Sequence, residues 1–356
     1  MRRLGLLLLC WPLISFAADK PLSLPEALAA ADAPHPDLSI AESDLAISLA
    51  DREQATSRQD FNLFLDGALR TGRQPGDDWS ADNVGRIVAR KSLLDFGRTE
   101  QAVAAADHEI AARRALLIDV RAARRIDLMA RFFDVLLADL QYAADNEFMT
   151  VAFLQWDNAR ERFSLGQITQ PQLIELEARF QDLRERRATT ALQQRASRQR
   201  LANAMNRPES LPSELIEPAL PGNEKKVPEY ETMLAQVLRR NPTLLSLNAQ
   251  ISASDARIAA ARSENRPTLE AEVLGAAYSR ESVTRDQVSA GLLVNIPLYQ
   301  GARIDSRVAR ERALRDRLLA QRDKFKLNLT QTVLDTLQEI EWLRGSARPA
   351  AEKQIE

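Results

Sequence analysis

The sequence predicts a mainly helical protein with two β-hairpins, in which one long helix has a helical neighbour on each side. Three observations indicate this fold class. Aromatic residues make up only 5% of the 356 residues, and there are 12 glycines, which is few for a protein made mostly of sheet. Residues 98–207 have a helical pattern that is interrupted once, at 164–167. Segments of alternating apolar and polar residues occur within 61–94 and 268–298, each before a long helical stretch.

Residues 1–18 are typical of a secretory signal peptide. Arg2 and Arg3 precede an apolar run over residues 4–14, and residues 15–17 (Ser-Phe-Ala) fit a small-x-small cleavage site. Cys10 is the only cysteine and lies inside this segment, so we expect a mature chain without a thiol or a disulfide. A lipoprotein signal would need a small residue before the cysteine, where Leu9 stands.

Residues 19–207 form the first of two predicted structural repeats. A short helix begins after Ser23, which has Glu26 at the spacing of a capping box, and a second helix spans residues 36–59. A β-hairpin follows at 61–94: residues 61–70 and 84–94 alternate, and residues 71–83 form its loop. A long helical hairpin over residues 98–207 completes the repeat.

The same order of elements recurs in residues 229–356, after a proline-rich linker at 208–228. Three residue pairs illustrate the offset of 206: Leu28 with Leu234, Pro36 with Pro242, and Leu63 with Leu269. Residues 92–98 match residues 297–303 at an offset of 205, so that Asp95 corresponds to Gln300. The second β-hairpin is expected at 268–298 and a long helix at 302–344. The sequence ends before the position that corresponds to the turn at Gly166. We therefore expect an incomplete second repeat, without its own turn and return helix.

Two seams run along residues 123–154 with the 3.5-residue period of helices that wind around one another. The first seam consists of Ala123, Ile126, Ala130, Phe133, Leu137, Leu140, Ala144, Glu147, Val151 and Leu154. The second seam consists of Leu128, Phe132, Val135, Asp139, Tyr142, Asn146, Met149 and Phe153. Because two seams require a neighbour on each side, we expect a curved wall of helices that can close into a tube. A long solvated stalk is the alternative.

The hairpin strands have the length and the pattern of strands that cross a bilayer. Each has about 10 residues, with one apolar and one polar face. After residue 14 no apolar run reaches the roughly 18 residues of a membrane helix, so any crossing would use strands. Four strands do not close a barrel, so several chains would have to combine their strands. A soluble two-layer sheet is the alternative.

The order of these features resembles the TolC-like outer-membrane efflux protein family. The resemblance is carried by Leu22-Ser23-Leu24-Pro25-Glu26-Ala27-Leu28, His35-Pro36-Asp37-Leu38, Asn241-Pro242-Thr243-Leu244, Arg266-Pro267-Thr268-Leu269, Ile296-Pro297-Leu298-Tyr299-Gln300-Gly301-Ala302-Arg303 and the turn Arg162-Phe163-Ser164-Leu165-Gly166. It implies a homotrimer whose pooled strands form a β-barrel in the outer membrane of a Gram-negative bacterium, continued by an α-helical barrel through the periplasm. It also implies a passive export duct that partners a periplasmic adaptor protein and an inner-membrane efflux pump or ABC transporter.

The resemblance predicts two functional regions. The adaptor-docking tip would comprise Arg162, Leu165, Gly166, Gln167 and Gln172. In the family an acidic residue commonly stands where this sequence has Gln172, so the usual charge is missing from this tip. The polar strand face, which would line the lumen, comprises Asp66, Arg70, Arg86, Arg90, Glu270 and Glu272. On a soluble sheet the same residues would form a solvated face.

The sequence predicts no catalytic, metal or cofactor site, and we expect a protein that is not an enzyme. His35 and His108 have no partner at metal-ligand spacing. The 48 Lys and Arg residues balance the 50 Asp and Glu residues, so no nucleic-acid partner is expected. Two other hypotheses remain at this point: a soluble periplasmic coiled-coil scaffold or adaptor, and a truncated, non-functional relative. The exported substrate and the class of partner transporter are not predicted.

Overall fold

The computed structural model describes residues 21–73, 78–210, 214–219, 226–279 and 287–347. The predicted signal peptide at 1–18 lies outside the described residues. The chain divides into two compact units. The hairpin unit comprises Met1–Pro36 and Arg121–Asn223, and the sheet unit comprises Asp37–Val120 and Glu224–Glu356. These units do not coincide with the predicted repeats, since a repeat is defined by the order of its elements and a unit by its contacts.

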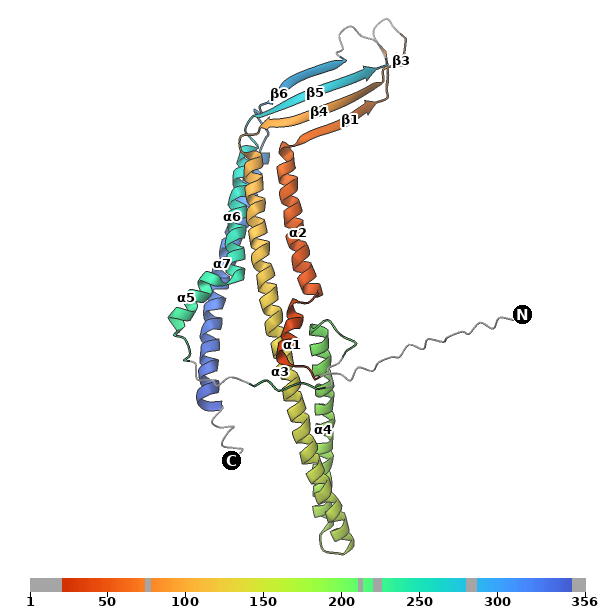
Figure 1. The fold of residues 1–356 in the computed structure, drawn as a ribbon, viewed down its shortest axis with the longest axis vertical. Helices are drawn as coiled ribbons and strands as arrows, with labels where there is room; N and C mark the ends of the chain where they lie inside the picture. The colour runs from red at the N-terminus through yellow and green to blue at the C-terminus, as the bar shows by residue number, and fades with distance from the viewer. Residues whose placement is uncertain (1–20, 74–77, 211–213, 220–225, 280–286, 348–356) are drawn as a thin grey trace, which may run out of the picture. The chain divides into compact units, whose positions relative to one another are not determined.

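The elements follow the predicted order (Figure 1). The first half contains α1 (Leu24–Ala29), η1 (Ala30–Asp32), α2 (Pro36–Thr56), η2 (Ser57–Gln59), β1 (Phe61–Ala68), β2 (Thr71–Gly72), β3 (Ser80–Ala81), β4 (Val84–Leu94), α3 (Arg98–Ser164) and α4 (Gln170–Ala204). The second half contains α5 (Tyr230–Arg240), α6 (Pro242–Ser263), β5 (Thr268–Tyr278), β6 (Val288–Asn295), α7 (Arg303–Trp342) and the π-helical turn η3 (Leu343–Ala347). The prediction of a mainly helical chain with two β-hairpins is confirmed.

The two β-hairpins differ from the prediction in three places. The first strand ends at Ala68 instead of Arg70, and the last strand ends at Asn295, before the predicted end of its hairpin. The segment 71–83, predicted as a loop, contains the short pair β2–β3. The backbone N–H of Arg70 donates to Asn83 Oδ1 at 3.1 Å, so a side chain takes the place of the strand ladder there.

In the hairpin unit, α1 and η1 pack against α3 and α4. The core consists of Ala27, Ala30, Ala31, Leu128, Phe132, Val135, Leu201 and Met205. Arg124 of α3 is buried, and its guanidinium donates to the carbonyl oxygens of Ala31 (3.2 Å), Ala30 (3.4 Å) and Ala204 (3.4 Å). These carbonyls lie in η1 and at the end of α4, where helical partners run out, so one side chain stabilises both segments.

The second seam of α3 faces α4, as a predicted neighbour requires. Its apolar residues Leu128, Phe132 and Val135 are fully buried. Its polar residues contact arginines of α4: Arg187 donates to Tyr142 Oη at 3.0 Å and to Asn146 Oδ1 at 2.8 Å. Each polar residue of the second seam thus has a polar partner on α4.

The first seam of α3 is solvent-exposed in the single chain. Leu137 is 66% exposed and Leu140 is 67% exposed. Apart from Phe133, which is half-buried, every member of this seam is exposed. No described element therefore covers the first seam, although it carries the same coiled-coil period as the covered seam.

In the sheet unit, α6 and α7 pack together through Ile258, Ala261, Ile304 and Val308. Three ion pairs join α3 to neighbouring helices: Arg52 of α2 with Asp107 (2.6 Å), Asp44 of α2 with Arg113 (3.3 Å), and Arg257 of α6 with Glu109 (3.1 Å). These pairs are partly exposed to solvent, where ion pairs add little to stability.

The strands of the two hairpins form one antiparallel sheet with the order β1-β4-β5-β6 (Figure 1). The central contact, β4 with β5, joins the first hairpin to the second. The strands β1 and β6 lie at the edges, and no other described strand pairs with them. Within the part of the chain that the structure describes, no helix is both long enough and apolar enough to cross a membrane.

Candidate functional site

The predicted docking tip is an exposed turn between α3 and α4. The N–H of Gly166 donates to the carbonyl of Phe163 (2.9 Å) and the N–H of Gln167 donates to that of Arg162 (2.9 Å), the pattern of a Schellman motif. Gly166 has a φ of 72°, a left-handed conformation that favours glycine. The turn presents Leu165, which is 65% exposed, next to the exposed Arg162.

The tip residue Gln172 caps the start of α4. Its Oε1 accepts the backbone N–H of Thr169 at 2.9 Å and the Thr169 hydroxyl at 3.0 Å. This is a capping box, in which the side chains of the first turn satisfy the free N–H groups of the helix. Gln172 is exposed, but its carbonyl oxygen is already engaged within the turn.

The strand register places the predicted lumen residues on one face of the sheet. Asp66 pairs in register with Arg86, and Arg90 pairs with Glu272, so these four side chains lie on the same face. Glu270 lies two residues before Glu272 in β5 and shares that face. The structure thus brings together five of the six predicted residues.

The sixth predicted residue, Arg70, lies beyond the end of β1. Its Nε donates to Asp82 Oδ2 at 2.8 Å, and its carbonyl accepts the N–H of Asp82 at 2.8 Å. The prediction that the strand continues to Arg70 is wrong, because Asp82 and Asn83 bind both the backbone and the side chain of this residue.

Arg90 is the centre of a charged group on the polar face. Its Nη2 lies 2.6 Å from Glu272 Oε2, and its Nε lies 4.0 Å from Glu270 Oε2. The guanidinium also lies 5.3 Å from the centre of the Phe64 ring, within cation–π range. These contacts join β1, β4 and β5 on one face, so Arg90 both charges that face and links three strands.

The opposite face of the sheet is apolar and exposed. The register partners Leu65 and Ile87 lie on this face, as do Val273 and Leu292. All four side chains are more than half exposed, with Leu65 at 76%. A contiguous exposed apolar surface of this kind marks contact with a membrane or with another protein.

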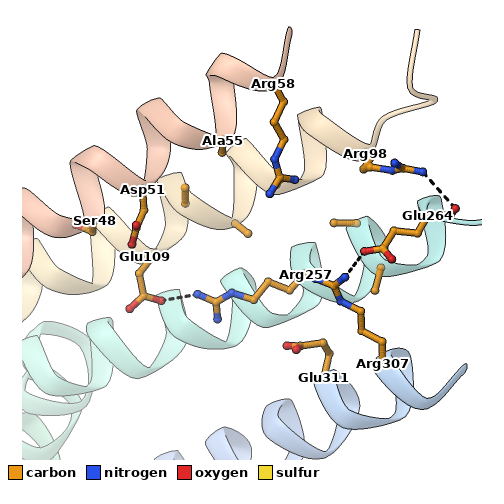
Figure 2. Close-up of a pocket in the computed structure, with 15 residues that line it drawn as sticks. Ser48, Asp51, Ala55, Arg58, Arg98, Glu109, Arg257, Glu264, Arg307 and Glu311 are labelled. Atoms are coloured by element: carbon orange, nitrogen blue, oxygen red, sulfur yellow. Dashed lines mark hydrogen bonds and ion pairs between the residues drawn. The ribbon is translucent and has the colours of Figure 1, made fainter. Parts of the chain in front are cut away.

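A charged cavity of about 320 Å³, the helical cavity, lies between α2, α3, α6 and α7 of the sheet unit (Figure 2). Glu109 accepts from Arg257 at 3.1 Å, and Glu264 accepts from Arg307 at 2.5 Å, as the dashed lines in Figure 2 mark. Four arginines and four carboxylates line it: Arg58, Arg98, Arg257 and Arg307 with Asp51, Glu109, Glu264 and Glu311. Because the positive and negative side chains balance, this cavity is typical of a solvated space between helices.

The pKa of Asp95, at the start of α3, is set by the hydrogen bonds with which this residue caps the helix. The carboxylate of Asp95 accepts the backbone N–H of Thr99 at 2.8 Å and that of Gly97 at 3.2 Å. Burial raises the pKa of Asp95, but the hydrogen bonds from Thr99 and Gly97 and the charge of Arg98 outweigh it, so the pKa lies below its ordinary value.

Among the described residues, no group of three or more His, Cys, Asp or Glu side chains is placed to hold a metal ion.

Comparisons with known proteins agree with this geometry. Residues 233–354 match the outer membrane efflux protein family. No curated protein matches the sequence significantly. The outer-membrane channel CmeC of Campylobacter jejuni is similar in structure, with a TM-score of 0.77 and 14% identity, over 93% of this chain and 74% of that chain.

Two further solved structures have the same fold. The outer membrane protein VceC of Vibrio cholerae has a TM-score of 0.74 and 17% identity, over 93% of this chain and 81% of that chain. The outer-membrane channel OprN has a TM-score of 0.76 and 18% identity, over 93% of this chain and 78% of that chain. The chain thus matches the outer membrane efflux protein family over residues 233–354, and its fold is that of the TolC-like outer-membrane channels.

Proposed function

We propose that this chain is one subunit of a trimeric export duct in the outer membrane. The observation that carries the proposal is the four-stranded sheet, which is open at β1 and β6 and exposes an apolar face. An open sheet edge is costly in lipid, because its N–H and C=O groups have no water to bind. Copies of the same sheet, joined edge to edge, satisfy those groups and turn the apolar face towards the lipid.

The helices support the same assembly. The second seam of α3 packs on α4 of the same chain, whereas the first seam is exposed. A seam with a 3.5-residue period packs against another helix. A second copy of the same chain can supply that helix, because subunits of a symmetric oligomer present identical surfaces to one another. We propose that the first seam packs against a neighbouring copy, which closes the helices into an α-barrel.

The duct would operate with a periplasmic adaptor and an inner-membrane efflux pump or ABC transporter. The exposed turn at Leu165 and Gly166 is the surface proposed for adaptor docking, since a glycine turn permits close backbone approach and Leu165 supplies an apolar contact. The polar face with Arg90, Glu270 and Glu272 would line the channel. Transport through such a channel requires no catalytic group in this chain.

Complementation of a strain that lacks its own outer-membrane duct tests this function. The full chain is expressed in that strain, and resistance to exported drugs and secretion of a reporter polypeptide are both measured. Restoration of either activity, and its loss when Leu165 is changed to Asp, supports the duct. A chain that restores neither activity, although it reaches the outer membrane, would contradict an export role.

A further inference from the structure

A second cavity, of about 400 Å³, lies where the helices of the sheet unit meet the strands. This junction cavity shares Arg58, Arg98, Glu264 and Arg307 with the helical cavity and adds Arg266 and Arg303. Five arginines thus line it, whereas Glu264 is its single carboxylate. Unlike the balanced helical cavity, the junction cavity carries a large excess of positive charge.

Most of these arginines are held by neutral oxygen atoms. Arg98 Nη2 donates to the carbonyl of Glu264 at 3.2 Å, and Arg266 Nη1 donates to the carbonyl of Phe96 at 3.0 Å. Arg303 donates to the side-chain oxygen of Gln300. These bonds orient the guanidinium groups without neutralising them, so the cavity is preorganised for an anion.

Two arginine groups also have donors without a protein acceptor. Arg58 makes no hydrogen bond or ion pair with the residues that the structure describes, and Figure 2 shows its side chain extending from the end of η2 towards α3 and α6. Arg98 Nε is buried without a hydrogen-bond partner within the same described part of the chain. A buried N–H donor that lacks an acceptor is costly, and an anionic oxygen would satisfy it.

The beginning of α7 adds to the positive potential. Asp95 binds the N–H groups of the first turn of α3, but the corresponding position before α7 is Gln300. The N-cap residue of α7, Ala302, makes no side-chain hydrogen bond to the helix. The N–H groups at the start of α7 therefore keep their partial positive charge next to Arg303 and Arg307.

Apolar side chains lie beside this charged cavity. Pro297 and Gln300 line the cavity, and the chain between them exposes Leu298 (91%) and Tyr299 (89%). A phosphate group next to exposed apolar side chains is the arrangement of a phospholipid, whose headgroup is anionic and whose tails are apolar. Tyrosine is also enriched at membrane interfaces, where one end of its ring is apolar and the other is hydrated.

We infer that the junction cavity binds the phosphate group of a phospholipid headgroup, at the level where the strands leave the lipid and the helices begin. The planar guanidinium of arginine matches phosphate oxygens with two parallel hydrogen bonds. Arg58, Arg98 and Arg303 would hold the phosphate, and Leu298 and Tyr299 would contact the acyl chains. This inference rests on the proposed function, which places the strands in a membrane.

Lipid binding to the purified full chain tests this inference. The chain is delipidated in a neutral detergent, and binding of phosphatidylglycerol is measured by native mass spectrometry and by the shift in melting temperature. Parallel samples contain inorganic phosphate or an uncharged diacylglycerol. The double variant Arg58→Gln with Arg303→Gln should bind phosphatidylglycerol about a hundredfold more weakly, since each of the two charge-assisted contacts that are lost costs about a factor of ten.

Arg312→Gln is the matched control, because Arg312 is an exposed arginine of α7 that does not line the cavity. It should bind phosphatidylglycerol like the unchanged chain. The single variant Arg58→Gln provides a second test that folding cannot obscure, because Arg58 has no partner among the described residues to lose. Equal binding by the arginine variants and the control would overturn the inference. Inorganic phosphate that binds as tightly as the lipid would overturn the headgroup as the ligand.

These outcomes are separable from the proposed duct. A chain that is soluble and monomeric in cells, but binds phosphatidylglycerol through Arg58 and Arg303 when purified, retains the anion site and loses the duct. A trimer in the outer membrane whose lipid binding does not depend on these arginines retains the duct and loses the site.

Discussion

Arg198 of α4 binds Asp139 of α3 through both ends of its guanidinium group, with Nη1 2.6 Å from Oδ1 and Nη2 2.9 Å from Oδ2. Gln194 of α4 also donates to Asp139 Oδ1, at 2.9 Å. Asp139 is a charged residue at a position of the second seam, so the pair fixes which turn of α4 lies opposite which turn of α3. A polar residue at one seam position is a known means of setting helix register.

Loss of Arg198 should destabilise the helical hairpin. Arg198→Ala leaves the partly buried Asp139 carboxylate without its charged partner, and we expect a loss of about 2 kcal/mol in the free energy of unfolding. Urea unfolding followed by circular dichroism measures it. Arg200→Ala, at an exposed arginine of the same helix, should change stability by less than about 0.5 kcal/mol. An equal effect of both variants would show that the ion pair has no special role.

The double variant Asp139→Leu with Arg198→Leu tests whether the ion pair sets the register of α3 against α4 or only stabilises the hairpin. Apolar side chains of similar size often replace a buried ion pair without loss of stability. We expect the unfolding free energy to recover to within about 1 kcal/mol of the unchanged chain. We also expect cysteine cross-links engineered between α3 and α4 to form in more than one register, which is the result that a purely stabilising pair would not give.

The exposed first seam should be needed for assembly and not for folding. Leu137→Asp with Leu140→Asp places two charges in the proposed interface between copies, and we expect no trimer on unheated gels. The helical content should not change, because both side chains are exposed in the single chain. Ala143→Asp, at an exposed position of α3 outside both seams, should leave the trimer intact. A trimer that survives the double substitution would place the interface elsewhere.

Substitutions in the docking tip should affect adaptor binding and leave assembly of the trimer unchanged. Leu165→Asp removes the exposed apolar side chain of the turn, and we expect loss of adaptor binding in pull-down experiments while the trimer persists. Gly166→Ala should have a smaller effect, a local cost of about 1 kcal/mol, because a Cβ there meets no atom within 4 Å and only the left-handed backbone is disfavoured. Stronger loss of binding from Gly166→Ala than from Leu165→Asp would argue against an apolar contact.

Acid should remove the capping contribution of Asp95. Its folded-state pKa is lowered, so the stabilisation is present above the unfolded-state pKa of about 3.9 and is lost as the pH falls through the lower folded-state pKa. Asp95→Ala should cost about 1 kcal/mol at pH 7. Melting curves from pH 7 to pH 3 should show the difference between the two proteins narrowing at the acid end. A constant difference across that range would exclude the ionised carboxylate as its source.

The local sequence pattern predicted most of the helices and strands, but fewer of the contacts that form the candidate sites. Strict alternation located β4 and β5 within their observed bounds, and the 3.5-residue period of the second seam predicted the packing of α3 on α4. The extension of β1 to Arg70 failed because the contacts of Asp82 and Asn83 with Arg70 are not visible as a period. The partner of Asp139 was likewise unpredictable, since nothing near residue 139 indicates which arginine of α4 lies opposite.

The junction cavity shows the same limit more clearly. Arg58, Arg98, Arg266 and Arg303 come from four segments that are distant in sequence, and each alone is an ordinary arginine near the end of a helix or strand. Only the meeting of the two hairpins with α3 and α7 brings them together. The charge excess is a property of the fold, so no motif in the sequence marks it.

Native mass spectrometry of the protein, extracted with detergent from isolated outer membranes, tests directly whether three copies assemble into one duct. Because identical neighbours would cover both the open sheet edges and the exposed first seam, we expect a complex with the mass of three chains, recovered only with detergent. A single chain recovered in the soluble periplasmic fraction would contradict it.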